Sequence, residues 1–179
     1  MRRLLTLLLL LALGAGAQAI PRYRRADWPH WSTQVGGCDT RQTVLIRESK
    51  VPVTKRGACT VLTGEWYDPY SGETFTRPQQ LDVDHVVPLE NAHRSGGWAW
   101  DRPRKQVYAN DLTEGHLLAV SARLNRQKGS KGPEAWVPPS TAYQCQYGRL
   151  WDGIKERWGL SMTGPERAAV SRLLATCPN

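Results

Sequence analysis

The residues Leu81-Asp82-Val83-Asp84-His85-Val86-Val87-Pro88-Leu89 form the most informative stretch of this sequence. Apolar and polar residues alternate through its first half, which predicts a half-buried strand, and Pro88 predicts that the strand ends soon after His85. At a strand end, Asp84 and His85 can diverge around one site. A carboxylate offers a hard oxygen to a divalent cation, and an imidazole titrates near neutral pH. The pair therefore favours metal binding beside a general base.

Downstream of this stretch the sequence predicts a helix, a second short strand and another helix. Residues 101–103 (Asp-Arg-Pro) are typical of a helix start, and this helix should run to about residue 109. The apolar run 117–120 predicts a strand, after which Ser121 can cap a short helix. Residues 129–139 are rich in Gly, Lys and Pro and predict a loop.

Upstream, the pattern predicts a helix and then β-hairpins. Asp39 or Thr40 can cap a short helix through residues 43–46. Residues 58–62 and 65–67 are β-branched and aromatic, which favours strands. The turn signal Asp-Pro-Tyr-Ser-Gly at 68–72 is followed by an extended segment at 74–76.

The C-terminal part predicts two helices that pack on the core. One apolar stripe has helical spacing; its members are Tyr143, Tyr147, Leu150, Trp151, Ile154 and Trp158. Thr163-Gly164-Pro165-Glu166 is typical of a capping box, and Val170, Leu173 and Leu174 continue at helical spacing.

The first residues predict secretion. Arg2 and Arg3 precede an apolar run, and small residues end in Ala17-Gln18-Ala19, the layout of a signal peptide over residues 1–19 cleaved after Ala19. A membrane anchor is the alternative, but the apolar run is shorter than a spanning helix needs. Cleavage would lower the formal net charge from +8 to +6 by removing two arginines. A basic chain suits an acidic partner such as nucleic acid. We expect a secreted or periplasmic protein without membrane attachment, and a monomer by default.

Four cysteines, all after the signal segment, predict two disulfides in a secreted chain. Three pairings are possible. We favour Cys38–Cys59 and Cys145–Cys177, because each closes a loop within its own half of the chain. A four-cysteine zinc site is the alternative, but the chain has no C-x-x-C pair to nucleate it.

Two motifs together resemble a known superfamily. Asp84-His85-Val86-Val87-Pro88, followed after a short apolar strand by Asn125-Arg126-Gln127-Lys128-Gly129, is similar to the HNH endonuclease signature. The chain as a whole resembles secreted bacterial HNH proteins related to the C-terminal domain of GmrSD-type restriction enzymes, over roughly residues 38–158. In these proteins the patterns at 66–72 and 109–112 recur around the first motif. The resemblance implies an α+β fold with a ββα-metal core at 82–128, in one nuclease domain (38–179) that follows an extended arm (20–37).

The resemblance also implies roles for individual residues. Asp84 and Asn125 match metal ligands, and His85 matches the general base that deprotonates the attacking water. The central motif residue, which orients the catalytic histidine, matches His116, with Asn110 as a second candidate. Asparagine at the last position favours a hard ion, so we expect one Mg²⁺, with Mn²⁺ or Zn²⁺ as alternatives. Four basic residues are candidates for binding the phosphates of the substrate; they are Arg123, Arg126, Lys128 and Lys131.

The sequence thus predicts a secreted metal-dependent endonuclease that hydrolyses phosphodiester bonds in DNA, with RNA also open. The metal would stabilise the charge on the phosphate and on the leaving oxygen. One alternative is a non-catalytic nucleic-acid-binding module on a degenerate HNH scaffold. Another is a zinc hydrolase that combines His85, His93 and His116, although their spacing matches no recognised zinc motif. We expect His93 to be partly exposed on a helical turn, Glu90 to help orient the site, and His30 to be structural.

Overall fold

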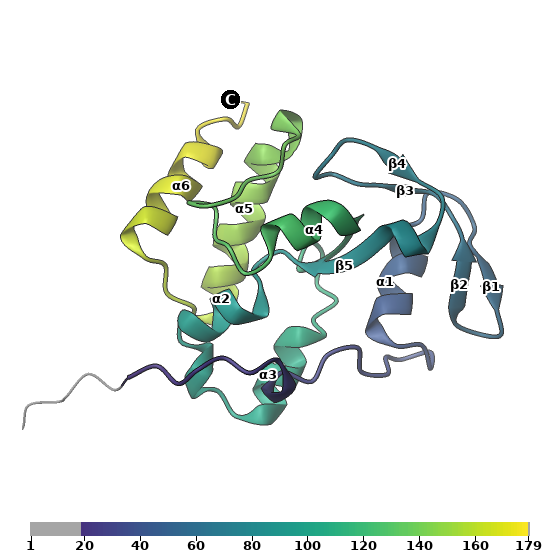
Figure 1. Cartoon of the computed structure of the whole chain (residues 1–179), viewed down its shortest axis with the longest axis horizontal. Helices are drawn as coiled ribbons and strands as arrows, with labels where there is room; N and C mark the ends of the chain where they lie inside the picture. Colours follow the sequence, from purple (N-terminus) through teal and green to yellow (C-terminus); the bar gives the residue numbers. More distant parts are fainter. Residues whose placement is uncertain (1–18, 179) are drawn as a thin grey trace, which may run out of the picture.

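The computed structural model describes residues 19–178, so the predicted signal peptide lies outside the described residues except for Ala19. Helices and small antiparallel sheets make an α+β fold (Figure 1). The α-helices are α1 (Thr40–Glu48), α2 (Leu89–Arg94), α3 (Arg102–Ala109), α4 (Ala122–Lys128), α5 (Thr141–Trp158) and α6 (Gly164–Leu174). The strands are β1 (Thr54–Arg56), β2 (Thr60–Thr63), β3 (Trp66–Tyr67), β4 (Thr74–Phe75), β5 (Leu81–His85) and β6 (Leu117–Ser121).

The antiparallel pair β5 and β6 lies at the centre of the molecule (Figure 1). Its register places Leu81 opposite Ser121 and His85 opposite Leu117. Strand alternation sends the apolar residues of one face into a core shared with α1. Helix α4 follows β6 directly and covers the other face, where it bonds Asp82 and Asp84. The predicted strand, its end at His85 and the helix after Ser121 are confirmed.

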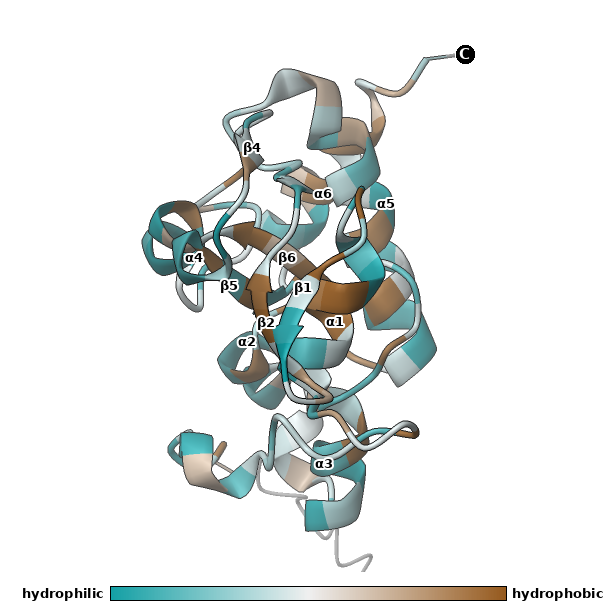
Figure 2. Ribbon diagram, turned by 90° about the vertical axis from the view of Figure 1, so that its right-hand side faces the viewer, coloured by the Kyte–Doolittle hydropathy of each residue, from teal (hydrophilic) through white to brown (hydrophobic). Residues whose placement is uncertain are grey.

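The segment before this pair contains two hairpins, as the sequence predicted. Strand β1 pairs with β2 and β3 pairs with β4, both antiparallel. Helix α1 begins after Asp39, whose side chain accepts a hydrogen bond from the backbone of Gln42. Figure 2 shows hydrophobic residues gathered on the central elements and hydrophilic ones along β1. The hairpins therefore form an outer layer beside α1 rather than part of the central sheet.

Helices α5 and α6 cover the opposite side of the core (Figure 1). Tyr147, Trp151 and Ile154 of the predicted stripe are fully buried. The predicted capping box forms at the start of α6, between Thr163 and Glu166. The helix pair is thus fixed by the apolar stripe and by a cap that the sequence already indicated.

Both disulfides form with the pairing that the sequence favoured. Cys38–Cys59 and Cys145–Cys177 have Sγ–Sγ distances of 2.00 and 2.04 Å. The first joins the end of the N-terminal arm to the β1–β2 hairpin, and the second joins α5 to the chain after α6. Each therefore closes a loop within its own half of the chain.

The N-terminal arm is largely irregular, with one short 3-10 turn at Arg25–Asp27. It runs along the edge of the molecule past α2 and α3 (Figure 1). Trp28 in the arm is fully buried, so this segment is anchored to the core. His93, expected to be partly exposed, is only 4% exposed, because the arm covers it: its Nε2–H donates to the carbonyl of Pro21 at 2.8 Å. Among the described helices, none is long and apolar enough to cross a membrane.

Candidate functional site

His85 is the last residue of strand β5, and a hydrogen bond to the backbone of another element holds its ring. Its Nε2 lies 2.8 Å from the carbonyl oxygen of Ala109, at the end of α3. Because a carbonyl only accepts, Nε2 carries the proton and Nδ1 keeps its lone pair. Within residues 19–178, no group hydrogen-bonds to Nδ1. The backbone contact therefore selects the tautomer that a general base requires.

The His85 side chain opens into a hollow of about 290 Å³, called the His85 hollow below. Asn125 and Arg126 of α4 line one part of it, and Tyr23 and Arg25 of the N-terminal arm line another. Pro88, Leu89 and Glu90 form its floor at the start of α2. The hollow thus brings together the two predicted motifs and a segment that lies far from both in the sequence.

Aromatic rings fix the plane of the His85 imidazole. Trp31 stacks on it with ring centroids 5.7 Å apart and an interplanar angle of 19°. Trp31 has a φ of 59°, a left-handed conformation that bulky residues rarely adopt. Tyr108 lies nearly parallel to His85, at 6.5 Å. Burial is the main reason that the pKa of His85 falls well below its usual 6.5, and the neighbouring His116 adds to this. His85 is therefore neutral, and able to accept a proton, at neutral pH.

Asp84 points away from the His85 ring, into a buried ion pair. Both of its carboxylate oxygens accept from the ammonium of Lys128, at 2.9 and 2.6 Å, and one also accepts from the hydroxyl of Tyr70 at 2.7 Å. Burial raises the pKa of Asp84, while the Lys128 charge opposes the rise. Lys128 is fully buried and also donates to the backbone carbonyl of His85 at 2.8 Å. Burial likewise lowers the pKa of Lys128, while the Asp84 charge opposes the fall, so each group favours the charged form of its partner, and the contacts fix the end of β5.

The residues predicted to bind a metal fit a divalent cation only at Asn125. Its Nδ2 donates to Asp82 at 3.2 Å, and no described residue donates to its Oδ1, which is the oxygen that a hard cation would use. Asp84 does not fit, because Lys128 already neutralises its charge and its carboxylate does not line the His85 hollow. The described part of the chain contains no group of three or more His, Cys, Asp and Glu residues placed to hold a metal. The three-histidine zinc site is therefore not formed.

The two candidates for the central motif position have different surroundings. The Asn110 amide accepts from Thr40 and the backbone of Ser32, and it donates to the carbonyls of Pro29 and Gln106. Asn110 therefore ties the arm to α1 and α3, and it is the carbonyl one residue earlier that holds His85. His116 lies edge-on to the His85 ring, at 6.1 Å, and contacts it only through packing. The histidine is thus oriented by the backbone of Ala109 rather than by either of the predicted residues, His116 and Asn110.

Comparison with known proteins agrees with this arrangement of motifs. The family model of the GmrSD restriction endonucleases, C-terminal domain, matches residues 40–169. The chain belongs to this family. An uncharacterized secreted protein of Arthroderma benhamiae is 43% identical over 155 residues, which cover 87% of this chain and 76% of that protein. No solved structure matches the chain.

The basic residues of this GmrSD C-terminal domain differ in how accessible they are. Arg123, Arg126 and Lys131 are exposed, as a phosphate contact requires. Lys128 was expected to join them, but this expectation is wrong: the residue, the last of α4, is fully buried because its ammonium bonds the Asp84 carboxylate and the His85 carbonyl. Arg126 contacts Asp82 at 3.4 Å, so part of its charge is used within the fold.

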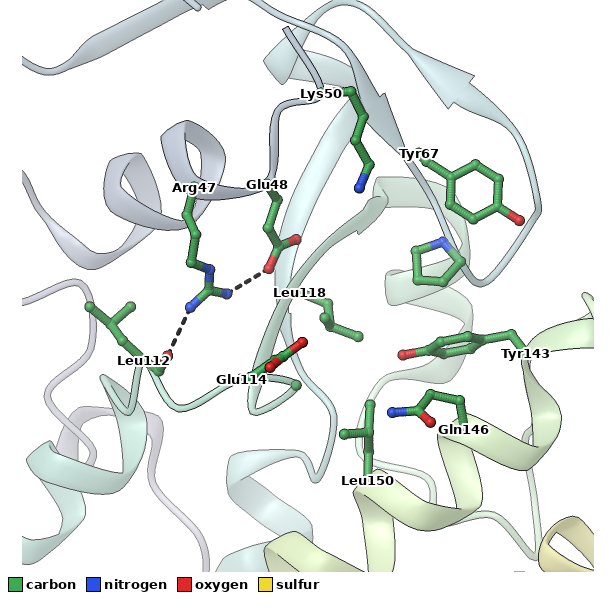
Figure 3. A pocket seen from close by; sticks show the side chains of 12 residues that line it. Arg47, Glu48, Lys50, Tyr67, Leu112, Glu114, Leu118, Tyr143, Gln146 and Leu150 are labelled. Carbon is green, nitrogen blue, oxygen red and sulfur yellow. Dashed lines mark hydrogen bonds and ion pairs between the residues drawn. The ribbon is translucent and has the colours of Figure 1, made fainter. Parts of the chain in front are cut away.

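A second hollow of about 820 Å³ lies at the outer edge of β6 and contains none of the predicted catalytic residues (Figure 3). Arg47 and Glu48 of α1 form an ion pair at 2.6 Å on one wall. Tyr143 and Leu150 of α5 point into it from the opposite wall (Figure 3). We call it the edge hollow; its larger volume does not make it the candidate site.

Sequence reasoning missed several parts of the site. The Ala109 carbonyl is a backbone group, so the residue type at position 109 does not indicate its hydrogen bond to His85. Tyr70 binds Asp84 and Trp31 stacks on His85, yet both lie in stretches that the sequence indicated only as turn or arm. Arg25 and Tyr23 line the hollow from residues that precede the match to the GmrSD family. The crowding of Tyr, Trp and Arg residues in the arm was the one available signal.

Proposed function

We propose that this protein is a secreted, metal-dependent endonuclease that hydrolyses phosphodiester bonds, with DNA as the favoured substrate and RNA as the second. The observation that carries the proposal is the state of His85: its Nε2–H is bound to the Ala109 carbonyl, which leaves the lone pair on Nδ1, and the residue lines the His85 hollow. Membership of the GmrSD C-terminal domain family and the secreted relative support it. We further propose that β5, β6 and α4 form a ββα-metal core, since β5 pairs with β6 and α4 follows β6 directly and contacts β5.

The protein's own residues would act as follows. The lowered pKa keeps His85 neutral, so that Nδ1 can take the proton from a water in the hollow as that water attacks phosphorus. Trp31 and the Ala109 carbonyl hold the ring so that this lone pair keeps its direction. Lys128 fixes the Asp84 carboxylate and the backbone of His85 as one unit.

A divalent cation, with Mg²⁺ favoured, belongs to the proposal. When bound, it supplies positive charge that stabilises the phosphate and the leaving oxygen. The amide oxygen of Asn125 is the protein oxygen that fits it, and the remaining positions would be filled by water and substrate, as Mg²⁺ allows. We propose no metal-binding role for Asp84 while it is paired with Lys128.

The test is cleavage by the purified protein of plasmid, linear duplex, single-stranded DNA and RNA, in Mg²⁺, Mn²⁺, Ca²⁺ and Zn²⁺. We expect His85→Ala to lower the cleavage rate by about 10²- to 10⁴-fold, the usual contribution of a general base. Glu114→Ala, an exposed change in the edge hollow, serves as the control and should cleave like the wild type. Circular dichroism would show that both variants are folded. Equal cleavage by His85→Ala and the wild type would rule out this role for His85.

A second function is favoured by the Asp84–Lys128 pair. Lys128 already balances the charge of the Asp84 carboxylate, as a catalytic cation would. The scaffold could therefore bind nucleic acid without turnover. This non-catalytic module predicts saturable DNA binding with no cleavage in any of the four metals. The same set of assays therefore separates the two functions.

A further inference from the structure

The N-terminal arm contributes two side chains to the His85 hollow although it precedes the family match, which begins at residue 40. We infer that the arm is a substrate-binding element and that Arg25 binds a backbone phosphate of the nucleic acid beside His85. This inference rests on the proposed function and deepens it: it assigns a phosphate contact to a segment outside the family domain.

Arg25 is the basic residue of the hollow whose charge no carboxylate of the described residues neutralises, although its guanidinium lies near the Tyr23 hydroxyl. Among residues 19–178, no carboxylate forms a salt bridge with it, whereas Arg126 contacts Asp82 at 3.4 Å. Glu90, the acidic residue of the hollow, is paired with Arg94 at 2.7 Å. Exposed at the hollow, the Arg25 guanidinium is therefore available to an anion.

The arm is anchored on both sides of Arg25. Before it, the carbonyl of Pro21 accepts from His93, and after it Trp28 is fully buried against aromatic rings. The carbonyl of Pro29 then accepts from Asn110 at 2.8 Å. A phosphate-binding side chain on a segment that is already ordered loses little conformational entropy on binding.

The position of Arg25 relative to the catalytic histidine suits a substrate contact. Burial is the largest cause of the lowered pKa of His85, and the positive charge of Arg25 is one of the smaller causes. Arg25 and His85 line the same hollow, so a phosphate bound by Arg25 there would lie beside the His85 ring. A guanidinium can bind two phosphate oxygens at once, which would orient the backbone as well as attract it. The arm would therefore help to place the substrate at Nδ1.

The test compares Arg25→Gln with Arg24→Gln. Arg24 is the adjacent residue of the arm, it is exposed, and it does not line the hollow, so both changes remove one positive charge from the same segment. Binding of a fluorescent duplex is measured by anisotropy in EDTA over a range of salt concentrations, and cleavage is measured in parallel. For Arg25→Gln we expect about tenfold weaker binding. We also expect the slope of log affinity against log salt to fall by about one. Arg24→Gln should stay near the wild type.

The outcomes separate this inference from the proposed function. If the wild type cleaves, and if both variants bind with the affinity and salt slope of the wild type, the role of Arg25 would be overturned and the proposed nuclease function would stand. Equal losses in both variants would also overturn it, because they would reflect only net charge. Arg25-dependent binding without any cleavage would keep the arm as a binding element and reject the nuclease. A wild type that neither binds nor cleaves would reject both.

Discussion

The edge hollow and the His85 hollow differ both in size and in the state of their polar groups. The edge hollow is the larger, at about 820 Å³ against about 290 Å³ for the His85 hollow. In the edge hollow, Arg47 donates to the carbonyl of Leu117, and Glu48 accepts from the backbone N–H of Ala119. These two side chains satisfy backbone groups at the open edge of β6, where another strand would otherwise pair.

In the His85 hollow, by contrast, a nearly buried imidazole is left available, and Arg25 lines the same hollow. Within the described residues, no hydrogen-bonding partner reaches Nδ1 of His85, and no salt bridge involves Arg25. Buried polar groups are usually hydrogen-bonded, so a nearly buried imidazole with a free nitrogen beside a hollow is a candidate for handling a ligand or a proton. An available buried imidazole, rather than volume, therefore distinguishes the candidate site from the edge hollow.

The largest effect on stability is expected at Lys128, beneath the His85 hollow. Lys128→Met would leave the Asp84 carboxylate buried without its cation, and breaking such a pair usually costs about 3–5 kcal/mol of unfolding free energy. Lys50→Met in the edge hollow removes an exposed ammonium and should change stability by less than about 0.5 kcal/mol. Urea denaturation of the two variants and the wild type measures the difference.

The double variant Asp84→Asn with Lys128→Met provides the control for this prediction. It removes both charges, so it should be more stable than Lys128→Met alone. If Lys128→Met proves as stable as Lys50→Met, the Asp84–Lys128 pair does not stabilise the structure beneath the His85 hollow. The expected difference in stability between changes at the two hollows would then be absent.

A smaller effect is expected from pH, through His116 in the aromatic cluster behind His85. Burial lowers the pKa of His116 from 6.5 to about 4. The unfolded chain therefore binds a proton at a higher pH than the folded chain does. Stability should be constant above about pH 7.5 and should fall between pH 6.5 and 4, by up to roughly 1.4 kcal/mol per pH unit. The lowered pKa of His85 acts in the same direction.

The measurement is urea denaturation of the wild type and of His116→Phe at several pH values from 4 to 8. The variant keeps an aromatic ring against Tyr108 but cannot titrate, so its stability should fall less steeply below pH 6.5. Identical pH dependence in the two proteins would show that His116 does not carry this linkage.

Much of the fold could be predicted because its signals are local. Strand β5 was visible in the alternation around Val83, and α6 in the capping box at Thr163. Each depends on residues within a few positions of one another. The position of the arm could not be predicted in this way, because it is fixed by contacts with residues such as His93, 72 positions away from Pro21.

The site was predictable only in part, for a related reason. His85 and Asn125 were found from two motifs, and the structure places both at one hollow. The partner of Asp84 was not found, because nothing in the spacing tells a buried Lys128 from an exposed one. The group that orients His85 is the backbone carbonyl of Ala109, which no side-chain pattern in the sequence could indicate. The motifs thus predicted His85 and Asn125, whereas the groups that set the protonation and direction of His85 depend on tertiary contacts.

The smallest effect is expected at the edge hollow itself, where Glu48→Ala would sharpen the contrast. Its carboxylate accepts from the backbone N–H of Ala119 at 2.7 Å and from Arg47. Removing it leaves that N–H partly buried without its acceptor, so we expect a loss of about 1 kcal/mol of unfolding free energy. Cleavage should not change, since β6 keeps its pairing with β5. Denaturation and cleavage measured on one preparation would check both statements. A variant of normal stability with impaired cleavage would contradict them and would assign the edge hollow a part in the reaction.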